Sequence, residues 1–311
     1  GLLEGLNDPY SVYYTAEEYR KMMEQTSGTY SGIGALVSQN AETGIITVVK
    51  AFADAPAAKA GVKNGDIIYK VKGKEVTVDI NNVVTEMKGE KGTTVDITVY
   101  RESEKKYIDF TITRDQVNEP TVEYKMLDKK KKIGYIQISQ FEEVTYDQFT
   151  KALDDLKAVI FDVRSNPGGL YETVCKMLDE ILPEGNLVST KDKYGNEEKQ
   201  TSDSKCLDMP MVVLQNKDSA SASEIFAGAI QDFNAGKIVG TQPFGKGIEQ
   251  TILPLSDGSA VKLTVQDYYT PSGKNIHGKG ITPDVEVELE ENATSDTQLE
   301  KAKETIMELM K

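Results

Sequence analysis

Between residues 158 and 235, apolar segments alternate with helical patterns, and this alternation limits the fold more than any other feature of the sequence. Residues 158–163 (AVIFDV) are apolar except for Asp162, as is typical of a buried strand. A helix is predicted at residues 169–182, a second strand at residues 211–215 and a second helix at residues 221–235. Strands that alternate with helices in this way predict an α/β domain.

The chain before residue 115 has a different, β-rich pattern. Apolar, β-branched segments separated by turn residues predict strands at residues 44–52, 67–71, 94–100 and 107–113. Short helices are predicted at residues 54–60, where Gly61 ends the helix, and at residues 79–88. The sequence therefore predicts a second domain over residues 29–115.

Further elements complete the division of the chain. Thr15 can cap a helix over residues 16–23, so residues 1–28 are predicted to be an N-terminal helical segment. The α/β domain is assigned residues 116–290, and the polar, amphipathic residues 291–311 are predicted to form a C-terminal helix. Within the α/β domain, residues 122–127 and 133–139 are expected to form a hairpin and residues 146–156 a helix. Further strands are expected within residues 237–270 and at residues 284–289.

Composition excludes several classes of function. The 311 residues suffice for two domains, and a formal net charge of −14 argues against nucleic-acid binding, which needs a basic face. The lysines at residues 129–132 are predicted to lie in a hairpin turn. No apolar run of about eighteen residues is present, so no membrane span is predicted. The chain opens with Gly1 rather than Met, so we expect a processed or trimmed chain whose export signal or anchor lies outside it.

Histidine and cysteine are scarce. The single His277 excludes a metal site built from several histidines, and no metal or cofactor is expected. A Ser-His-Asp triad would have to use His277, but no acidic residue is close enough in sequence to orient its ring. Cys175 and Cys206 are too few for a disulfide framework. Two separate thiols and one bridge both fit the sequence, so the redox compartment stays open.

Residues 219–224 (SASASE) stand at the start of the helix predicted over 221–235. Ser221 followed three residues later by Glu224 is the pattern of a capping box, which needs no further function. A serine at a helix N-terminus also lies beside unpaired N–H groups and a favourable dipole, so Ser221 can also be a nucleophile. In that case the N–H of Ala222 could meet a developing oxyanion.

A serine nucleophile needs a base, and Lys246 is the candidate. It stands in a Gly-rich segment, residues 242–250 (QPFGKGIEQ), where an exposed loop lysine is the simpler interpretation. A lysine acts as a base only if desolvation lowers its pKa. If residues 246–253 form a strand, Lys246 and Gln250 point to one face, and Gln250 can hold the amine as the third member of a triad holds its base.

Residues 161–169 (FDVRSNPGG) supply a candidate for a second oxyanion donor. Pro167 and Gly168 can simply form a turn. Consecutive glycines after a buried strand also expose N–H groups at the carboxyl edge of a sheet, where ligands often bind. We assign the donor to Gly168, with Gly169 next to it, and expect Arg164 and Asp162 to form a structural pair.

A second Gly-rich segment precedes a strand in the first domain, at residues 30–37 (YSGIGALV). Such a loop can offer N–H groups to the C-terminal carboxylate of a peptide while the strand edge pairs with the peptide backbone. A plain β-turn is the alternative.

Together these segments resemble the C-terminal processing peptidases, also called tail-specific proteases. The interval between Ser221 and Lys246, 246 − 221 = 25 residues, fits the family and selects Ser221 over Ser219 and Ser223. The other matching segments are residues 219–224, 244–247 (FGKG), 166–169 (NPGG), 268–273 (YYTPSG) and 280–284 (GITPD). Residues 30–114, notably 55–66 (APAAKAGVKNGD), resemble the family's PDZ domain.

The resemblance implies a multi-domain α/β protein, with a β-rich PDZ domain and an α/β serine protease core of the crotonase/ClpP-like spiral type. It implies Ser221 as nucleophile, Lys246 as general base and Gln250 as the residue that positions the base. It further implies an oxyanion hole formed by the amides of Gly168 and Ala222, and no cofactor.

The implied substrates are proteins with accessible, often apolar C-termini, which the PDZ domain captures first. Gly32, Ile33 and Gly34 fall on its carboxylate-binding loop, and Lys88 takes a helix-end position where some relatives have a basic residue that senses the substrate. Members of the family are usually exported and many are bacterial, so an extracytoplasmic location is expected, either secreted, periplasmic or membrane-anchored. The N-terminal segment is shorter than in full relatives, which leaves a homo-oligomer open.

Two other functions fit part of the sequence. A PDZ-bearing peptide-binding or scaffold protein could have an inactive peptidase-like core, but such a protein would be free to lose Ser221, Lys246 or Gln250, and all three are present. A Ser-His hydrolase would use His277, which a His277→Ala variant would test.

Overall fold

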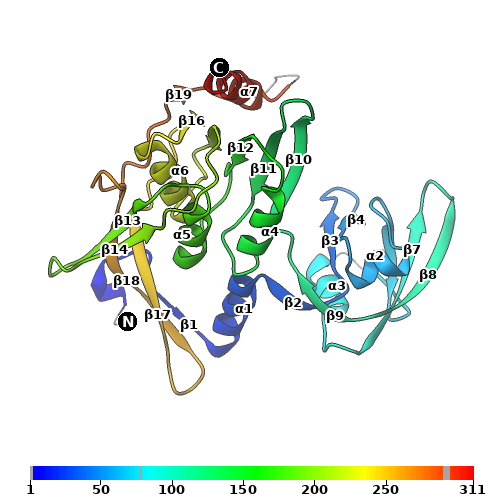
Figure 1. Cartoon of the computed structure of the whole chain (residues 1–311). Helices are drawn as coiled ribbons and strands as arrows, with labels where there is room; N and C mark the ends of the chain where they lie inside the picture. The colour runs from blue at the N-terminus through cyan, green and yellow to red at the C-terminus, as the bar shows by residue number, and fades with distance from the viewer. Residues whose placement is uncertain (1–2, 77–78, 290–294) are drawn as a thin grey trace. The chain divides into compact units, whose positions relative to one another are not determined.

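The structure is a computed structural model that describes residues 3–76, 79–289 and 295–311 (Figure 1). The chain folds into two compact units. The small unit is Gly28–Pro120, and the large unit joins the residues up to Ser27 to Thr121–Lys311. The helices at both ends of the chain thus belong to the large unit. The predicted fold class, a β-rich domain and an α/β core, is confirmed.

The small unit is an antiparallel sheet with two helices. Its strand order is β3–β4–β5–β7–β8, and the short β6 pairs with β5. The strands are β3 Ala35–Gln39, β4 Ile46–Ala51, β5 Ile67–Val71, β6 Lys74–Glu75, β7 Thr94–Arg101 and β8 Lys106–Thr113, and the helices are α2 Pro56–Ala60 and α3 Ile80–Met87. Every second residue of β7 (Val95, Ile97 and Val99) is buried, so one face of the sheet carries the core.

The two ends of the small unit meet. Strand β2 (Thr29–Gly32) pairs antiparallel with β9 (Asp115–Asn118). Beyond this pair, the N–H of Glu119 donates to the carbonyl of Gly28 at 2.7 Å. The chain therefore enters and leaves the small unit at neighbouring points.

The large unit is built on a six-stranded sheet of order β10–β11–β12–β15–β16–β19. All neighbouring pairs are parallel except β10 with β11. The strands are β10 Val122–Asp128, β11 Ile133–Ile138, β12 Ala158–Asp162, β15 Met211–Gln215, β16 Gly236–Gly240 and β19 Val285–Glu286, and the helices that pack on them are α4 Thr145–Ala152, α5 Tyr171–Asp179, α6 Ala222–Asp232 and α7 Thr297–Leu309.

Helices cover both faces of this sheet (Figure 1). Val159 and Phe161 of β12 pack in the core with residues of α4, α5 and α6. Ala158 and Ile160, which point to the opposite face, pack in a second core with Ala302 and Ile306 of α7. Because both faces of β12 are buried, its first four residues are continuously apolar rather than alternating.

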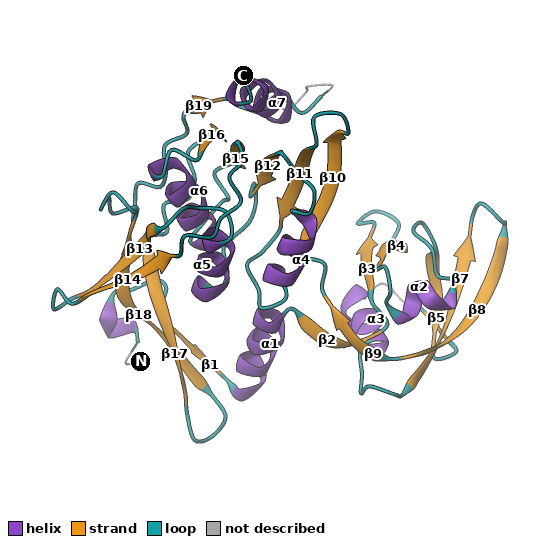
Figure 2. Ribbon diagram, in the orientation of Figure 1, coloured by secondary structure: helices purple, strands orange, loops and turns teal. Residues whose placement is uncertain are grey.

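A second, antiparallel sheet belongs to the large unit, with the order β1–β18–β13–β14, and β17 also pairs with β18 (Figure 2). Its strands are β1 Val12–Tyr14, β13 Gly185–Asp192, β14 Glu197–Ser202, β17 Ile248–Pro254 and β18 Ala260–Tyr269. A 3-10 turn at Glu4–Leu6 precedes β1, and the N-terminal helix α1 (Ala16–Ser27) follows β1 directly.

Several sequence predictions are confirmed. Strands β5 and β15 have the predicted bounds, and residues 129–132 form the turn between β10 and β11. The strands β13 and β14 had no predicted counterpart. Strand β14 (EEKQTS) has no apolar residue to mark it, and β13 (GNLVSTKD) has only Leu187 and Val188. No helix among the described residues has the length and apolar character needed to cross a membrane.

Candidate active site

Ser221, Lys246 and Gln250 line one cleft of about 920 Å³ in the large unit. The cleft is also lined by Phe141 and Gly169. The structure therefore brings the three predicted catalytic residues together, although 25 residues (246 − 221) separate the serine from the lysine in sequence.

Ser221 immediately precedes α6 and has a strained backbone. Its φ is 57° and its ψ is −115°, a region that residues with a Cβ rarely adopt. Such conformations cost about 1–3 kcal/mol and occur mostly at functional sites. The N–H of Ser221 donates to Glu224 Oε2 at 3.0 Å. This is the contact between the glutamate side chain and the N-cap backbone that a capping box predicts.

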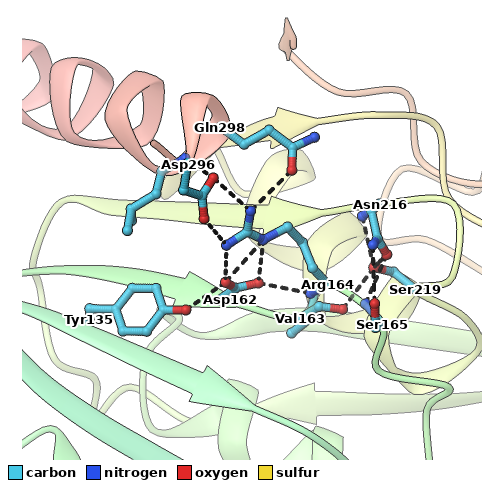
Figure 3. Close-up of polar contacts among 10 residues, drawn as sticks. Tyr135, Asp162, Val163, Arg164, Ser165, Asn216, Ser219, Asp296 and Gln298 are labelled. Atoms are coloured by element: carbon cyan, nitrogen blue, oxygen red, sulfur yellow. Dashed lines mark hydrogen bonds and ion pairs between the residues drawn. The ribbon is translucent and has the colours of Figure 1, made fainter. Parts of the chain in front are cut away.

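The loop after β15, which leads to Ser221, is tied to the loop after β12 (Figure 3). The hydroxyl of Ser219 donates to the carbonyl of Val163 at 2.7 Å. The N–H of Ser165 donates to Asn216 Oδ1 at 2.8 Å. Because β12 and β15 are adjacent parallel strands, both loops leave the sheet at the same edge, as ligand-binding loops commonly do.

Gly168 lies against the serine. A Cβ on Gly168 would lie 2.8 Å from Ser221 Cβ and 3.1 Å from the nitrogen of Ala222, and φ at this residue is 107°. Only glycine fits there. The N–H of Gly168 donates to Asn166 Oδ1 at 2.8 Å, whereas the hydrogen bonds of the described residues include none from the N–H of Gly169 or Ala222.

Lys246 is held through its amine. Lys246 Nζ donates to Gln250 Oε1 at 3.1 Å, and Gln250 Nε2 donates to the carbonyl of Tyr10 at 2.7 Å. Strand β17 begins only at Ile248, and a bulge lies between Glu249 and Gln250. Residues 246–253 therefore do not form one regular strand, the condition under which Lys246 and Gln250 were expected to share a face, and their contact arises beside a bulge instead.

The surroundings of Lys246 favour the neutral amine. Burial lowers its pKa from the ordinary value, and the positive charge of Lys262 lowers the pKa further. Asp8 acts in the opposite direction. Among the described residues, no hydrogen bond joins the Ser221 hydroxyl to the Lys246 amine. Such bonds often form only when substrate is bound.

Glu224 is a site residue that the sequence indicated only as a helix cap. Its side chain is fully buried and accepts three backbone N–H groups: Gly245 at 2.9 Å, Lys246 at 2.8 Å and Ser221 at 3.0 Å. Burial raises the pKa of Glu224, although the three N–H groups favour its anion. One carboxylate thus ties the backbone of the serine to the backbone of the lysine.

The remaining candidates lie elsewhere. His277 is exposed, lies beside Tyr10 and lines a different cavity from the one that Ser221 lines. Cys175 is buried and Cys206 is half-buried, and both are free thiols. Within the described residues, no group of histidine, cysteine and acidic side chains could hold a metal ion.

Arg164 and Asp162 form the expected structural pair (Figure 3). Arg164 Nη2 lies 2.6 Å from Asp162 Oδ2, and Asp162 is 1% exposed. The same guanidinium binds Asp296, which caps α7, at 2.8 Å, and Tyr135 donates to Asp162 at 2.6 Å. This network fixes α7 to the end of β12.

In the small unit, the predicted peptide-binding residues border a groove of about 40 Å³ between β3 and α3. Ile33, Gly34 and Lys88 line it, and a Cβ on Gly32 would lie 3.5 Å from the Cα of Lys88. Lys88 Nζ lies 4.6 Å from the ring centroid of Tyr30. Val84 and Met87 of α3 supply the apolar wall.

Known proteins match this chain over nearly its full length. The family model "Peptidase family S41" matches residues 132–287, and the PDZ domain model matches residues 31–112. A carboxy-terminal-processing protease of Bartonella bacilliformis is 41% identical over 302 residues, which cover 93% of this chain and 68% of the relative. A probable CtpA-like serine protease of Staphylococcus epidermidis is 38% identical, and the match covers 92% of this chain but 59% of that protein. The solved structure of a photosystem II D1 C-terminal processing protease is 28% identical, with a TM-score of 0.57, over 96% of this chain and 83% of that one.

Proposed function

The chain belongs to peptidase family S41 and carries a PDZ domain, and on this premise we propose that it is a serine endopeptidase with a Ser221–Lys246 dyad. The observation that carries the proposal is the surroundings of the lysine. Lys246 shares a cleft with Ser221, and burial and a neighbouring lysine favour its neutral form. A neutral amine can accept the proton of a serine hydroxyl, and an ammonium cannot.

In the proposed reaction, Lys246 Nζ takes the proton of Ser221 Oγ as Oγ attacks the carbonyl carbon of the scissile peptide. The C–N bond of the tetrahedral intermediate then breaks, and the Lys246 ammonium gives its proton to the leaving amine. Water enters, loses a proton to Lys246 and attacks the acyl-enzyme, and Ser221 leaves with that proton. Gln250 keeps the amine oriented throughout.

The oxyanion hole is proposed to use the N–H of Ala222 and an N–H from the segment that contains Gly168. Ala222 lies at the N-terminus of α6, where the helix dipole favours a negative charge. The Gly168 N–H must leave Asn166 Oδ1 before it can serve, whereas the Gly169 N–H already lacks a partner among the described hydrogen bonds.

The PDZ domain is proposed to capture the C-terminus of the substrate. Strand β3 is an edge strand to which an extended peptide can add, and Gly32, Ile33 and Gly34 lie at its start. Lys88 brings a positive charge to the groove, and the small apolar groove suits a short aliphatic side chain. The name of the Bartonella relative, a carboxy-terminal-processing protease, supports substrates of this kind.

Cleavage of an unfolded protein with an apolar C-terminus tests the proposal. Wild type should cut it, and Ser221→Ala and Lys246→Ala should each lose at least about a hundredfold in rate while they remain folded. His277→Ala is the matched control and should cut normally. If wild type binds such tails but never cuts them, the protein is a peptide-binding scaffold, and the endopeptidase proposal is wrong.

A further inference from the structure

The N-terminal segment lies beside the proposed base, at the other end of the sequence. Strand β1 pairs antiparallel with β18, with Val12 opposite Lys262 and Tyr14 opposite Ala260. Asp8 holds the turn before β1, because its carboxylate accepts the N–H of Tyr10 at 3.1 Å and the hydroxyl of Ser11 at 2.5 Å. These contacts place Tyr10 next to Lys246 and Gln250.

The carbonyl of Tyr10 determines which way the Gln250 amide faces. A carboxamide has a donor end and an acceptor end, and a backbone carbonyl can only accept. Gln250 Nε2 must therefore face Tyr10, which leaves Oε1 to face Lys246 Nζ. In this orientation Gln250 accepts an N–H of the amine, so the amine's lone pair is free to point elsewhere in the cleft.

The ring of Tyr10 also lies over the amine. Its centroid is 5.4 Å from Lys246 Nζ. The ring therefore occupies space on one side of the amine that water would otherwise fill. The charged groups that act on the amine are Lys262 and Asp8, and the Glu224 carboxylate binds the backbone of Lys246.

We propose that Tyr10 is a positioning residue for the lysine base, acting through the orientation of Gln250 and through the exclusion of water from the amine. The inference rests on the proposed dyad. It adds to the site a residue from a segment 211 positions (221 − 10) before the serine.

The test is the pH dependence of kcat/KM for tail cleavage. Tyr10→Ala opens the amine to water, which favours the ammonium, so the acid limb should move to higher pH and the rate at pH 7 should fall by about tenfold. Tyr10→Phe keeps the ring and the backbone and should follow wild type. Tyr13→Ala is the matched control, since Tyr13 lies three residues further on, in β1, and is 48% exposed.

A double-mutant cycle separates positioning from a general loss of structure. Tyr10→Ala keeps the backbone carbonyl that Gln250 binds and removes only the ring. Because Gln250 holds the amine beside that ring, loss of the ring should cost less in a Gln250→Leu background than in wild type. Equal losses in both backgrounds, or a Tyr10→Ala profile that overlays wild type, would overturn the inference. If Tyr10→Ala fails to fold, Tyr10→Ser replaces it, because serine also opens the amine to water and is well suited to the turn before β1.

The two proposals fail in different ways. Full activity of Lys246→Ala would refute the dyad itself. If Lys246→Ala is inactive but Tyr10→Ala shows an unmoved acid limb, only the role of Tyr10 is wrong. Titration of the labelled Lys246 amine by NMR gives a readout that needs no substrate, and Tyr10→Ala should raise the pKa of that amine.

Discussion

Glycine at position 221 should leave the protein more stable than alanine, although both substitutions remove the hydroxyl. The φ of 57° and ψ of −115° at Ser221 cost a residue with a Cβ about 1–3 kcal/mol, and glycine very little. At an N-cap, alanine costs about 1 kcal/mol and glycine only a few tenths. Glycine gives back about 0.4–1 kcal/mol of this advantage, because it raises the conformational entropy of the unfolded chain. The net expectation is that Ser221→Gly exceeds Ser221→Ala by about 1–3 kcal/mol in unfolding free energy.

Urea unfolding followed by far-UV circular dichroism measures this difference, because the chain has no tryptophan for fluorescence. The small unit, Gly28–Pro120, is an internal reference, and any separate transition that it shows should not move. If Ser221→Ala is as stable as Ser221→Gly or more so, the backbone at this residue is not strained, and the argument from its conformation is refuted.

Three further predictions concern the groups around the serine. Burial lowers the pKa of Lys246 in the folded protein. Between this pKa and that of the unfolded chain, the unfolded chain binds more protons, which disfavours folding. Lys246→Met should therefore stabilise the protein at neutral pH. The gain should shrink as pH rises towards about 10.4, and urea unfolding at several pH values checks it. Glu224→Ala leaves three N–H groups without their acceptor and should cost about 3 kcal/mol as well as most of the activity; unchanged stability would contradict the clamp. Arg164→Ala leaves Asp162 buried and unpaired and should cost about 3–5 kcal/mol, whereas Arg164→Met with Asp162→Asn should cost less, as thermal melts would show.

Local patterns were enough to predict the framework of the large unit. Residues 158–161 are all apolar because both faces of β12 are covered, and Gly61 ends α2 because its φ is 100°. The predicted helix over residues 169–182 begins two residues late, at Tyr171. Gly169, with φ of 144°, lies in the backbone bridge to Phe141 instead.

Contacts between distant segments could not be predicted in this way. The Glu224 spacing indicated a helix cap, but nothing local indicated that the same carboxylate binds Gly245 and Lys246, 21 and 22 residues away. Tyr10 is 240 residues from Gln250, and β1 has only three residues. Such contacts depend on how β17 and β18 are placed, which periodicity does not reveal.

The pairing of β2 with β9, which brings the two ends of the small unit together, has a consequence for engineering. Both chain crossings occur at one place, where Glu119 and Gly28 share a hydrogen bond of 2.7 Å. The PDZ domain is thus an insertion with adjoining ends, the kind of junction where whole domains can be exchanged. A short loop from Ser27 to Thr121 could replace it, and a PDZ domain of different tail preference could be grafted there without changes to the chemistry of the core.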